Sequence, residues 1–192
     1  MQEKGEIFMQ RLSNYRKIER SEIGDPNEGL SGLHQADQIK SFRFNGKEIK
    51  KQIVGSVKMR VSNTPNPFIF PSYALTEKQF VNTKNNIDKR CLEFGDTALL
   101  ITDFTEFHKR IAKNINETDG IYRGLVKYID DKTFNGRMSV FNKFKGFNHQ
   151  NEYRIALYRN SKNDTLKFNI GSLKDISEIY PSSILLDGLT YE

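Results

Sequence analysis

The sequence has little of what disulfides and metal sites require. It contains one cysteine, Cys91, so no disulfide can form within the chain and no cysteine cluster is available for zinc. The three histidines, His34, His108 and His149, lie in unrelated contexts without the paired spacing of a zinc site. We therefore expect no metal site.

Long apolar runs and targeting segments are also missing. No stretch approaches the roughly 18–20 consecutive apolar residues of a transmembrane helix. The first ten residues, MQEKGEIFMQ, lack the apolar core and the cleavage site of a secretory signal. These absences predict a cytoplasmic protein with no membrane partner.

The fingerprints of common nucleotide-binding folds are absent as well. No G-x-x-x-x-G-K-[ST] segment occurs, and no G-x-G-x-x-G segment follows an expected strand. Charge of one sign is not concentrated either: 30 Lys and Arg against 24 Asp and Glu give a net charge of +6, without a run of five like charges. Such a diffuse excess fits a solvated surface or a phosphate-bearing ligand or partner.

Apolar and aromatic residues are present in sufficient number to build a core. Of the 192 residues 36% are hydrophobic, including 14 Phe and 8 Tyr, which predicts a single domain over residues 1–192. Glycine and proline divide the chain into short segments without regular strand–helix–strand alternation. This pattern predicts the α+β class, with a mixed or antiparallel split sheet and a few short helices.

Individual segments support this class. Asn45-Gly46 predicts a hairpin turn, and Pro71 predicts that the surrounding strand is kinked or lies at a sheet edge. Thr102 or Asp103 is placed to cap a helix, and Glu106 lies at the capping-box spacing from Asp103. Further strands are expected at 5–9, 54–61, 98–101 (buried and central), 122–129, 152–158, 165–170 and 183–186, and short helices at 11–19 and 138–144.

The most informative segment is the expected strand that begins at Glu152. Because side chains two apart on a strand point to the same face, Gln150, Glu152 and Arg154 share one side, and Tyr153 and Ile155 share the apolar side. An amide, a carboxylate and a guanidinium together can hold a polar ligand. Spacing alone favours the other interpretation, an exposed strand edge whose Glu152–Arg154 ion pair contributes little.

A second cluster lies near the N-terminus. Arg11, Arg16 and Arg20 are close in sequence to a polar loop that carries Asp25 and Glu28. Ordinary turn chemistry explains such a loop. The functional alternative is an arginine that clamps a phosphate beside a loop that closes over the ligand.

A third cluster interleaves aromatic residues with cations, as proteins that bind single-stranded nucleic acid do. It comprises Phe141, Lys143, Phe144, Lys145 and Phe147. The same residues also fit a helix that packs its phenylalanine side inward, and this interpretation is favoured. Of the remaining reactive residues, His108 is expected to be a surface or packing residue of its helix and not a base. Cys91 is expected to be a small buried hydrophobic residue.

Taken in order, short motifs along nearly the whole chain resemble those of a mostly uncharacterised family of small bacterial and phage proteins. The family's members begin one element earlier than this chain. The motifs here are Gly5-Glu6-Ile7-Phe8, Gly24-Asp25-Pro26-Asn27-Glu28, Tyr73-Ala74-Leu75-Thr76, Phe94-Gly95-Asp96 and Glu152-Tyr153-Arg154-Ile155.

More distantly, the layout is similar to the ADP-ribosyltransferase fold, a split mixed β core that binds NAD in a central cleft. Gln150-Asn151-Glu152 looks like the Gln-x-Glu element of that superfamily, and Thr76 falls where its Ser-Thr-Ser strand lies. The resemblance implies that Glu152 and Gln150 are catalytic. The residues that it implies for NAD contact are Arg11, Arg16, Tyr73, Thr76 and Arg154.

The resemblance also implies a mechanism. Breaking the nicotinamide–ribose bond develops oxocarbenium character, which a preorganised carboxylate stabilises. Glu152 would accept a hydrogen bond from the ribose 2′-hydroxyl, and Gln150 would orient the acceptor nucleophile. The loop of Asp25 and Glu28 would gate the cleft or orient an arginine. The partners would be a nucleotide and a macromolecular acceptor or host protein, as in phage–host conflict. The alternative is a non-enzymatic binding protein, for nucleic acid or for a host defence protein that it inhibits.

Overall fold

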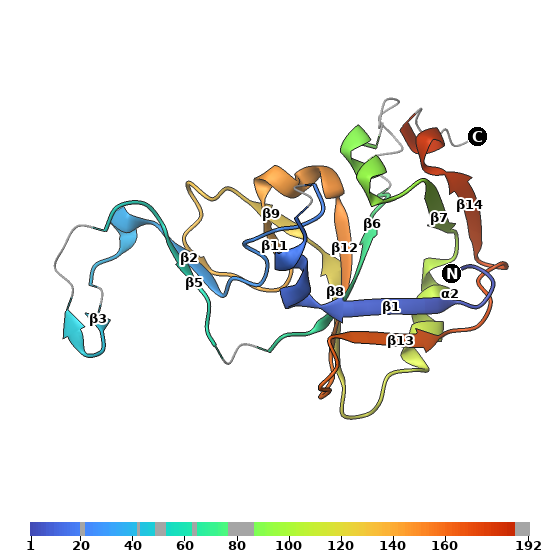
Figure 1. Ribbon diagram of the computed structural model, residues 1–192, viewed down its shortest axis with the longest axis horizontal. Helices are drawn as coiled ribbons and strands as arrows, with labels where there is room; N and C mark the ends of the chain where they lie inside the picture. Colours follow the sequence, from blue (N-terminus) through green and yellow to red (C-terminus); the bar gives the residue numbers. More distant parts are fainter. Residues whose placement is uncertain (20–21, 42, 49–52, 63–64, 77–86, 187–192) are drawn as a thin grey trace.

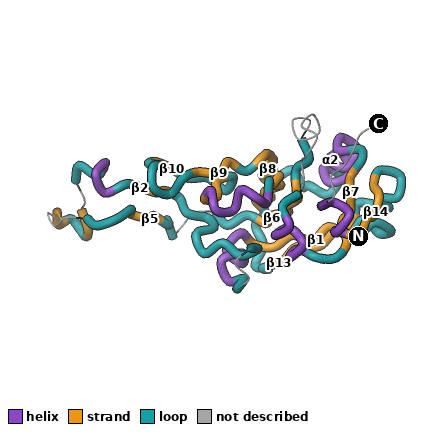
Figure 2. The backbone as a smooth tube through the Cα atoms, turned by 90° about the horizontal axis from the view of Figure 1, so that it is seen from above, coloured by secondary structure: helices purple, strands orange, loops and turns teal. Residues whose placement is uncertain are grey.

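The computed structural model describes residues 1–19, 22–41, 43–48, 53–62, 65–76 and 87–186. The molecule is elongated, with a sheet-containing body and an arm that projects from one end (Figures 1 and 2). It combines several small, mainly antiparallel sheets with few helices, which agrees with the predicted α+β class. Among the described residues, no helix has the length and apolarity needed to cross a bilayer.

A five-stranded antiparallel sheet forms the centre of the body. Its strand order is β13-β1-β6-β12-β8, so β1 and β13 are neighbours in space although they come from opposite ends of the chain. The expected strands at 5–9, 152–158 and 165–170 are confirmed. The bounds are β1 Glu6–Arg11, β6 Phe68–Tyr73, β8 Gly120–Leu125, β12 Glu152–Tyr158 and β13 Thr165–Asn169.

The prediction that Pro71 marks an edge strand is wrong, because β6 lies between β1 and β12. The Ala74 N–H donates to the carbonyl of Asn151, next to β12. Backbone groups alternate in direction along a strand, so the nitrogen of Pro71 points to the β1 side. There β1 pairs only with Phe68 and Ile69. The missing N–H of proline therefore interrupts no ladder.

One face of the sheet packs on the main core, around Ile7, Phe68, Ile155 and Leu157. Helix α2 (Phe104–Ala112) covers this core. Of the two candidate caps, Asp103 is the N-cap, and its side chain accepts from the Glu106 N–H at 2.8 Å. The segment expected as a buried central strand is instead β7 (Thr97–Ile101), which is half-buried and, among the strands that the structure describes, pairs only with β14 (Ser177–Pro181). The residues after β14 form the 3-10 helix η5 (Ser182–Leu186), so a strand at 183–186 is wrong.

The opposite face carries the short elements that build the site. They are the 3-10 helices η1 (Leu12–Lys17), η3 (Lys89–Phe94) and η4 (Lys145–Gln150) and the parallel strands β9 (Lys127–Ile129) and β11 (Asn142–Phe144). A helix at 138–144 is therefore wrong. The Asn142 side chain accepts from the Ser139 backbone N–H and hydroxyl, and this turn starts β11 in place of a helix.

The arm extends from this region and ends in a small hairpin (Figure 1). Asn45 and Gly46 both have positive φ, 48° and 77°, as the predicted two-residue turn requires. The arm contains β2 (Gly32–His34), η2 (Ala36–Gln38), β3 (Arg43–Phe44), β4 (Lys47–Glu48) and β5 (Val57–Met59), with β10 (Gly136–Arg137) beside β2.

Candidate functional site

Strand β12 presents core residues on one face and ionisable residues on the other. Ile155 and Leu157 are buried in the main core, and Tyr153 packs against it, as the alternation predicted. Glu152 and Arg154 occupy the opposite face. They are only 4% and 2% exposed, and β12 is an interior strand, so the interpretation as an exposed strand edge is wrong.

Gln150 lies near Glu152 and Arg154, but it precedes strand β12 and reaches them through a turn and not along extended backbone. It ends η4, and Asn151 follows in the left-handed region with a φ of 35°. The amide Nε2 of Gln150 donates to the carbonyl of Glu22 at 2.7 Å. Its Oε1 accepts from Lys143 Nζ at 2.6 Å. Both ends of the amide are therefore fixed, and the Gln-x-Glu pair converges on one cluster.

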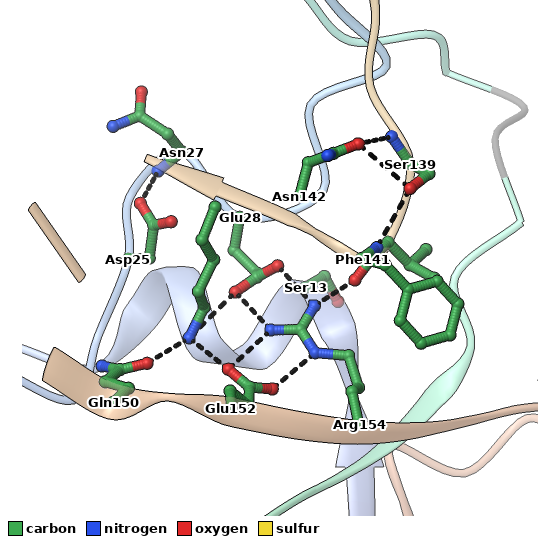
Figure 3. Close-up of polar contacts among 12 residues, drawn as sticks. Ser13, Asp25, Asn27, Glu28, Ser139, Phe141, Asn142, Gln150, Glu152 and Arg154 are labelled. Atoms are coloured by element: carbon green, nitrogen blue, oxygen red, sulfur yellow. Dashed lines mark hydrogen bonds and ion pairs between the residues drawn. The ribbon is translucent and has the colours of Figure 1, made fainter. Parts of the chain in front are cut away.

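Arg154 holds Glu152 in place. Its Nε lies 2.5 Å from Glu152 Oε1 and its Nη2 lies 3.1 Å from Oε2. Its terminal nitrogens also donate to both carboxylate oxygens of Glu28, at 2.9 and 3.2 Å, and Nη1 donates to the carbonyl of Val140. The guanidinium thus lies between two carboxylates (Figure 3). Such two-point pairs fix orientation as well as charge, so Arg154 positions Glu152.

Lys143 completes the group. Its ammonium lies 2.8 Å from Glu152 Oε2 and 3.7 Å from Glu28 Oε2, and the residue is only 4% exposed. We call Glu28, Lys143, Glu152 and Arg154 the ion cluster. Two carboxylates face two cations in it, so its charge is balanced, as burial of ions requires.

Burial and neighbouring charge act in opposite directions on the acids of this region. Burial alone raises the pKa of Glu152, but the charges of Arg154 and Lys143 and their hydrogen bonds outweigh it and lower that pKa. Asp25 is 2% exposed, and its burial raises the pKa of that carboxyl. Glu152 is therefore a stable carboxylate, whereas Asp25 is biased towards its protonated form.

The Gly24–Gly29 loop supplies Glu28 to the cluster. The Asp25 carboxylate accepts from the Asn27 N–H at 2.7 Å, and the Asp25 carbonyl accepts from the Glu28 N–H at 2.9 Å. These turn contacts aim the Glu28 side chain inward, where it is 1% exposed. The resemblance implies that this loop closes over the cleft or orients an arginine. Its contacts fit the second role, because Glu28 accepts hydrogen bonds from Arg154.

A cavity of about 320 Å³ opens beside the ion cluster. Tyr73, Gln150, Glu152 and Arg154 all line it, so four of the seven predicted site residues lie together. We call it the tyrosine-lined cavity because both Tyr73 and Tyr15 line it. Burial raises the pKa of Tyr15 to about 12, so its hydroxyl stays protonated and can donate. The apolar part of the wall comes mainly from Ile87, Leu92, Phe94 and Leu99.

The structure places the other three predicted site residues elsewhere. Arg11 donates to the carbonyls of Asn66 at 2.8 Å and Asn163 at 3.2 Å, and its guanidinium lies over the Phe68 ring. Arg16 lines a separate groove. Thr76 follows β6 and is not among the described residues that line either hollow. Arg20, of the same N-terminal cluster, lies outside the described residues.

Sequence reasoning missed Lys143 as a member of the site. The sequence places Lys143 in a surface that could bind nucleic acid or, in the favoured interpretation, in a helix that packs its phenylalanine side inward. The residue is instead buried and lies in strand β11. The available signal was the short β11 pattern, in which Lys143 is flanked by Asn142 and Phe144. The parallel pairing of β11 with β9 then directs Lys143 towards β12, and no local pattern predicts that pairing.

Two other potentially reactive side chains, His108 and Cys91, are at least partly buried among neighbouring residues. His108 is 7% exposed, and its ring lies against those of Phe104, Phe107 and Tyr153, which confirms the packing role. Cys91 is half-buried at the tyrosine-lined cavity. Burial raises the pKa of this thiol to about 11, so it is protonated at neutral pH.

Within the described ranges, no three His, Cys, Asp or Glu residues come together as metal ligands. Comparison with protein-family models, with curated proteins and with solved structures gives no significant match to any of them. The resemblance to the ADP-ribosyltransferase fold therefore stays a prediction that rests on the motifs of this sequence.

Proposed function

We propose that this protein is ADP-ribosyltransferase-like and binds the nicotinamide–ribose end of NAD in the tyrosine-lined cavity. The observation that carries the proposal is that Tyr73, Gln150 and Glu152 line one cavity, with the Glu152 carboxylate held in a fixed orientation. In this arrangement Glu152 accepts a hydrogen bond from a ribose hydroxyl.

The size and lining of the cavity support this choice of ligand. Ligand cavities are typically about 300–1,000 Å³, with mostly apolar walls and a few fixed polar groups. At about 320 Å³, this cavity suits a ring and one sugar and is too small for a whole dinucleotide. The adenosine diphosphate part of NAD would extend outside it.

Electrostatics set a limit on the chemistry. A free carboxylate beside the ribose would stabilise the positive charge that develops when the nicotinamide bond breaks. Glu152 already faces Arg154 and Lys143, so most of its charge is compensated. This observation favours a second candidate function, a binding protein that holds the ligand without rapid turnover. The two candidates share the cavity and differ in turnover.

The first experiment measures NAD binding by calorimetry in variants matched for the substituted residue. Ala98 lines the cavity, whereas Ala112 is exposed on α2. Ala98→Phe should fill the cavity and weaken NAD binding by more than about tenfold, since an overfilled site excludes its ligand. Ala112→Phe should bind as the wild type does. Equal binding by Ala98→Phe, or no binding by the wild type, would refute the proposal.

The second experiment separates transfer from binding. Wild-type protein and Glu152→Gln are incubated with labelled NAD and a host lysate, and nicotinamide release and label transfer are measured. Turnover by the wild type that is lost in Glu152→Gln supports the transferase. Binding that depends on the cavity but gives no turnover assigns the non-enzymatic function. Full turnover by Glu152→Gln would show that this carboxylate is not catalytic.

A further inference from the structure

A larger hollow, about 770 Å³, lies next to the ion cluster on the side of η1 and the base of the arm. Val140 is part of its lining, and the Val140 carbonyl accepts from the buried guanidinium of Arg154. Arg154 in turn lines the tyrosine-lined cavity. The larger hollow and the tyrosine-lined cavity are therefore distinct, and the hydrogen bond from Arg154 to Val140 joins a residue of one wall to a residue of the other.

The charge of the larger hollow has one sign. Arg16 and Arg60 line it, and none of the described lining residues is acidic. We call it the arginine groove. Its other polar groups are neutral, mainly the hydroxyls of Ser13, Ser31 and Ser62 and the Asn66 amide. Two guanidinium groups without an acid between them create a local positive potential, which an anion would neutralise.

The two arginines differ in how they are held. Arg60 Nη2 donates to the carbonyls of Pro26 and Glu28, at 3.2 and 3.3 Å, which anchors this side chain at the groove. Arg16 is half-buried and makes no hydrogen bond to the described part of the chain. Burial lowers the pKa of Arg16, and the nearby charge of Arg60 lowers it further. The nearby Glu28 carboxylate acts in the opposite direction on this pKa, but Glu28 is paired with Arg154 and does not line the groove. The guanidinium of Arg16 is thus available to a ligand.

Aromatic side chains provide a second kind of surface in the same groove. Tyr122 is 60% exposed and packs edge-on against Tyr158, with ring centroids 5.5 Å apart. Phe141 also lines the groove, where it is half-buried and packs against the small core of Leu12, Ile69 and Ala156. Exposed aromatic faces next to arginines are the surfaces on which unpaired bases stack.

We infer that the arginine groove binds a nucleotide unit, with its phosphate on Arg16 and Arg60 and its base against Tyr122 and Phe141. The ligand is a phosphate ester attached to a planar ring, either a free mononucleotide or a nucleotide within a single-stranded nucleic acid. Arg16 and Arg60 carry the affinity for the phosphate, and the aromatic residues distinguish a nucleotide from a simple anion. This site is separate from the tyrosine-lined cavity and does not depend on NAD binding there.

The test uses fluorescence anisotropy of a 5′-fluorescein-labelled eight-nucleotide oligo(dT) with the full chain at low salt. Arg16→Gln and Arg60→Gln should each weaken binding about tenfold or more, because each removes a charge-assisted contact. Each should also reduce the slope of log affinity against log salt by about one. Arg43→Gln, on the exposed hairpin of the arm, is the matched control and should bind as the wild type does.

Competition distinguishes the source of the nucleotide. Displacement of the oligonucleotide by AMP at similar nucleotide concentration indicates a free mononucleotide, whereas displacement only by unlabelled oligonucleotide indicates a single-stranded chain. Tyr122→Leu should weaken binding of either. The inference is wrong if neither probe binds, if inorganic phosphate competes as well as AMP does, or if the Arg16 and Arg60 variants match the control. Ala98→Phe should leave this binding unchanged, so the result stands apart from that for the NAD proposal.

Discussion

Arg154 shows how a single buried residue sets the geometry of the site. It bonds to Glu28, Glu152 and the Val140 carbonyl, which belong to a loop, a strand and the segment before β11. Buried ion pairs add little net stability, because desolvation of the charges offsets their attraction. Their effect here is on position: the guanidinium fixes where the Glu152 carboxylate faces the tyrosine-lined cavity.

Asp25 leads to the first prediction at this scale, which concerns pH. Burial raises its pKa, so the folded state binds the proton more tightly than the unfolded state. Its contribution to stability is complete below the ordinary carboxyl pKa and is lost as the pH rises through the folded-state value. Asp25→Asn keeps an acceptor for the Asn27 N–H and removes the charge. We expect it to be more stable than the wild type at pH 7, by about 1 kcal/mol or more.

Urea unfolding between pH 4 and pH 8 checks this expectation. The stability advantage of Asp25→Asn should shrink as the pH falls towards 4, because the wild-type carboxyl then becomes protonated. Asp131→Asn changes an exposed aspartate and should show no such trend. A wild type that is more stable than Asp25→Asn at pH 7 would mean that the charged form of Asp25 is favoured in the fold.

At the scale of elements, the loop that carries Glu28 depends on Gly24. A Cβ atom at this position would lie 2.1 Å from the carbonyl oxygen of Ile18, which is backbone and cannot yield without moving the chain. Gly24→Ala should therefore displace the loop and reduce the free energy of unfolding by about 1–3 kcal/mol. Gly124→Ala, where a Cβ meets nothing within 4 Å, should change it by less than about 0.5 kcal/mol. Equal denaturation midpoints for the two variants would contradict this role of Gly24.

Local patterns predicted several elements correctly. Alternation identified β12 and its two faces, the Thr102-Asp103 pair identified the start of α2 to within one residue, and Asn45-Gly46 identified the hairpin. The Glu152–Arg154 pair was also predicted, because both residues lie on one strand two positions apart.

The sequence predictions that were wrong concern features set by contacts with residues in other segments of the chain. The position of β6 inside the sheet, despite Pro71, is set by where β1 ends. The exposure of the Glu152–Arg154 pair could not be judged, because Glu28 and Lys143 cover it from other segments. Arg11 and Arg16 are close in the chain, but Arg11 ends β1 whereas Arg16 lies in η1, so they face different surroundings. Spacing in the sequence could not reveal that separation.

At the scale of the whole molecule, β1 is an interior strand that joins both ends of the chain. Ile7 and Met9 are 0% and 2% exposed, and β1 separates β13 from β6. Deletion of residues 1–9 should therefore abolish cooperative unfolding, because the sheet loses an interior strand and part of its core. Circular dichroism during thermal denaturation checks this. A tag added before Met1, which is 50% exposed, should leave the transition in place. A cooperative transition in the deletion variant would show that β6, β12 and β8 fold without β1.

The same pairing has a consequence for when the protein can fold. β1 pairs along most of its length with β13, between Glu6–Gln10 and Thr165–Asn169. Contacts this distant in sequence require closure of a loop that contains nearly the whole chain, and such topologies fold slowly. During synthesis, β1 leaves the ribosome long before β13 has been made. We therefore expect folding to be largely post-translational, with the apolar side of β1 uncovered in the nascent chain.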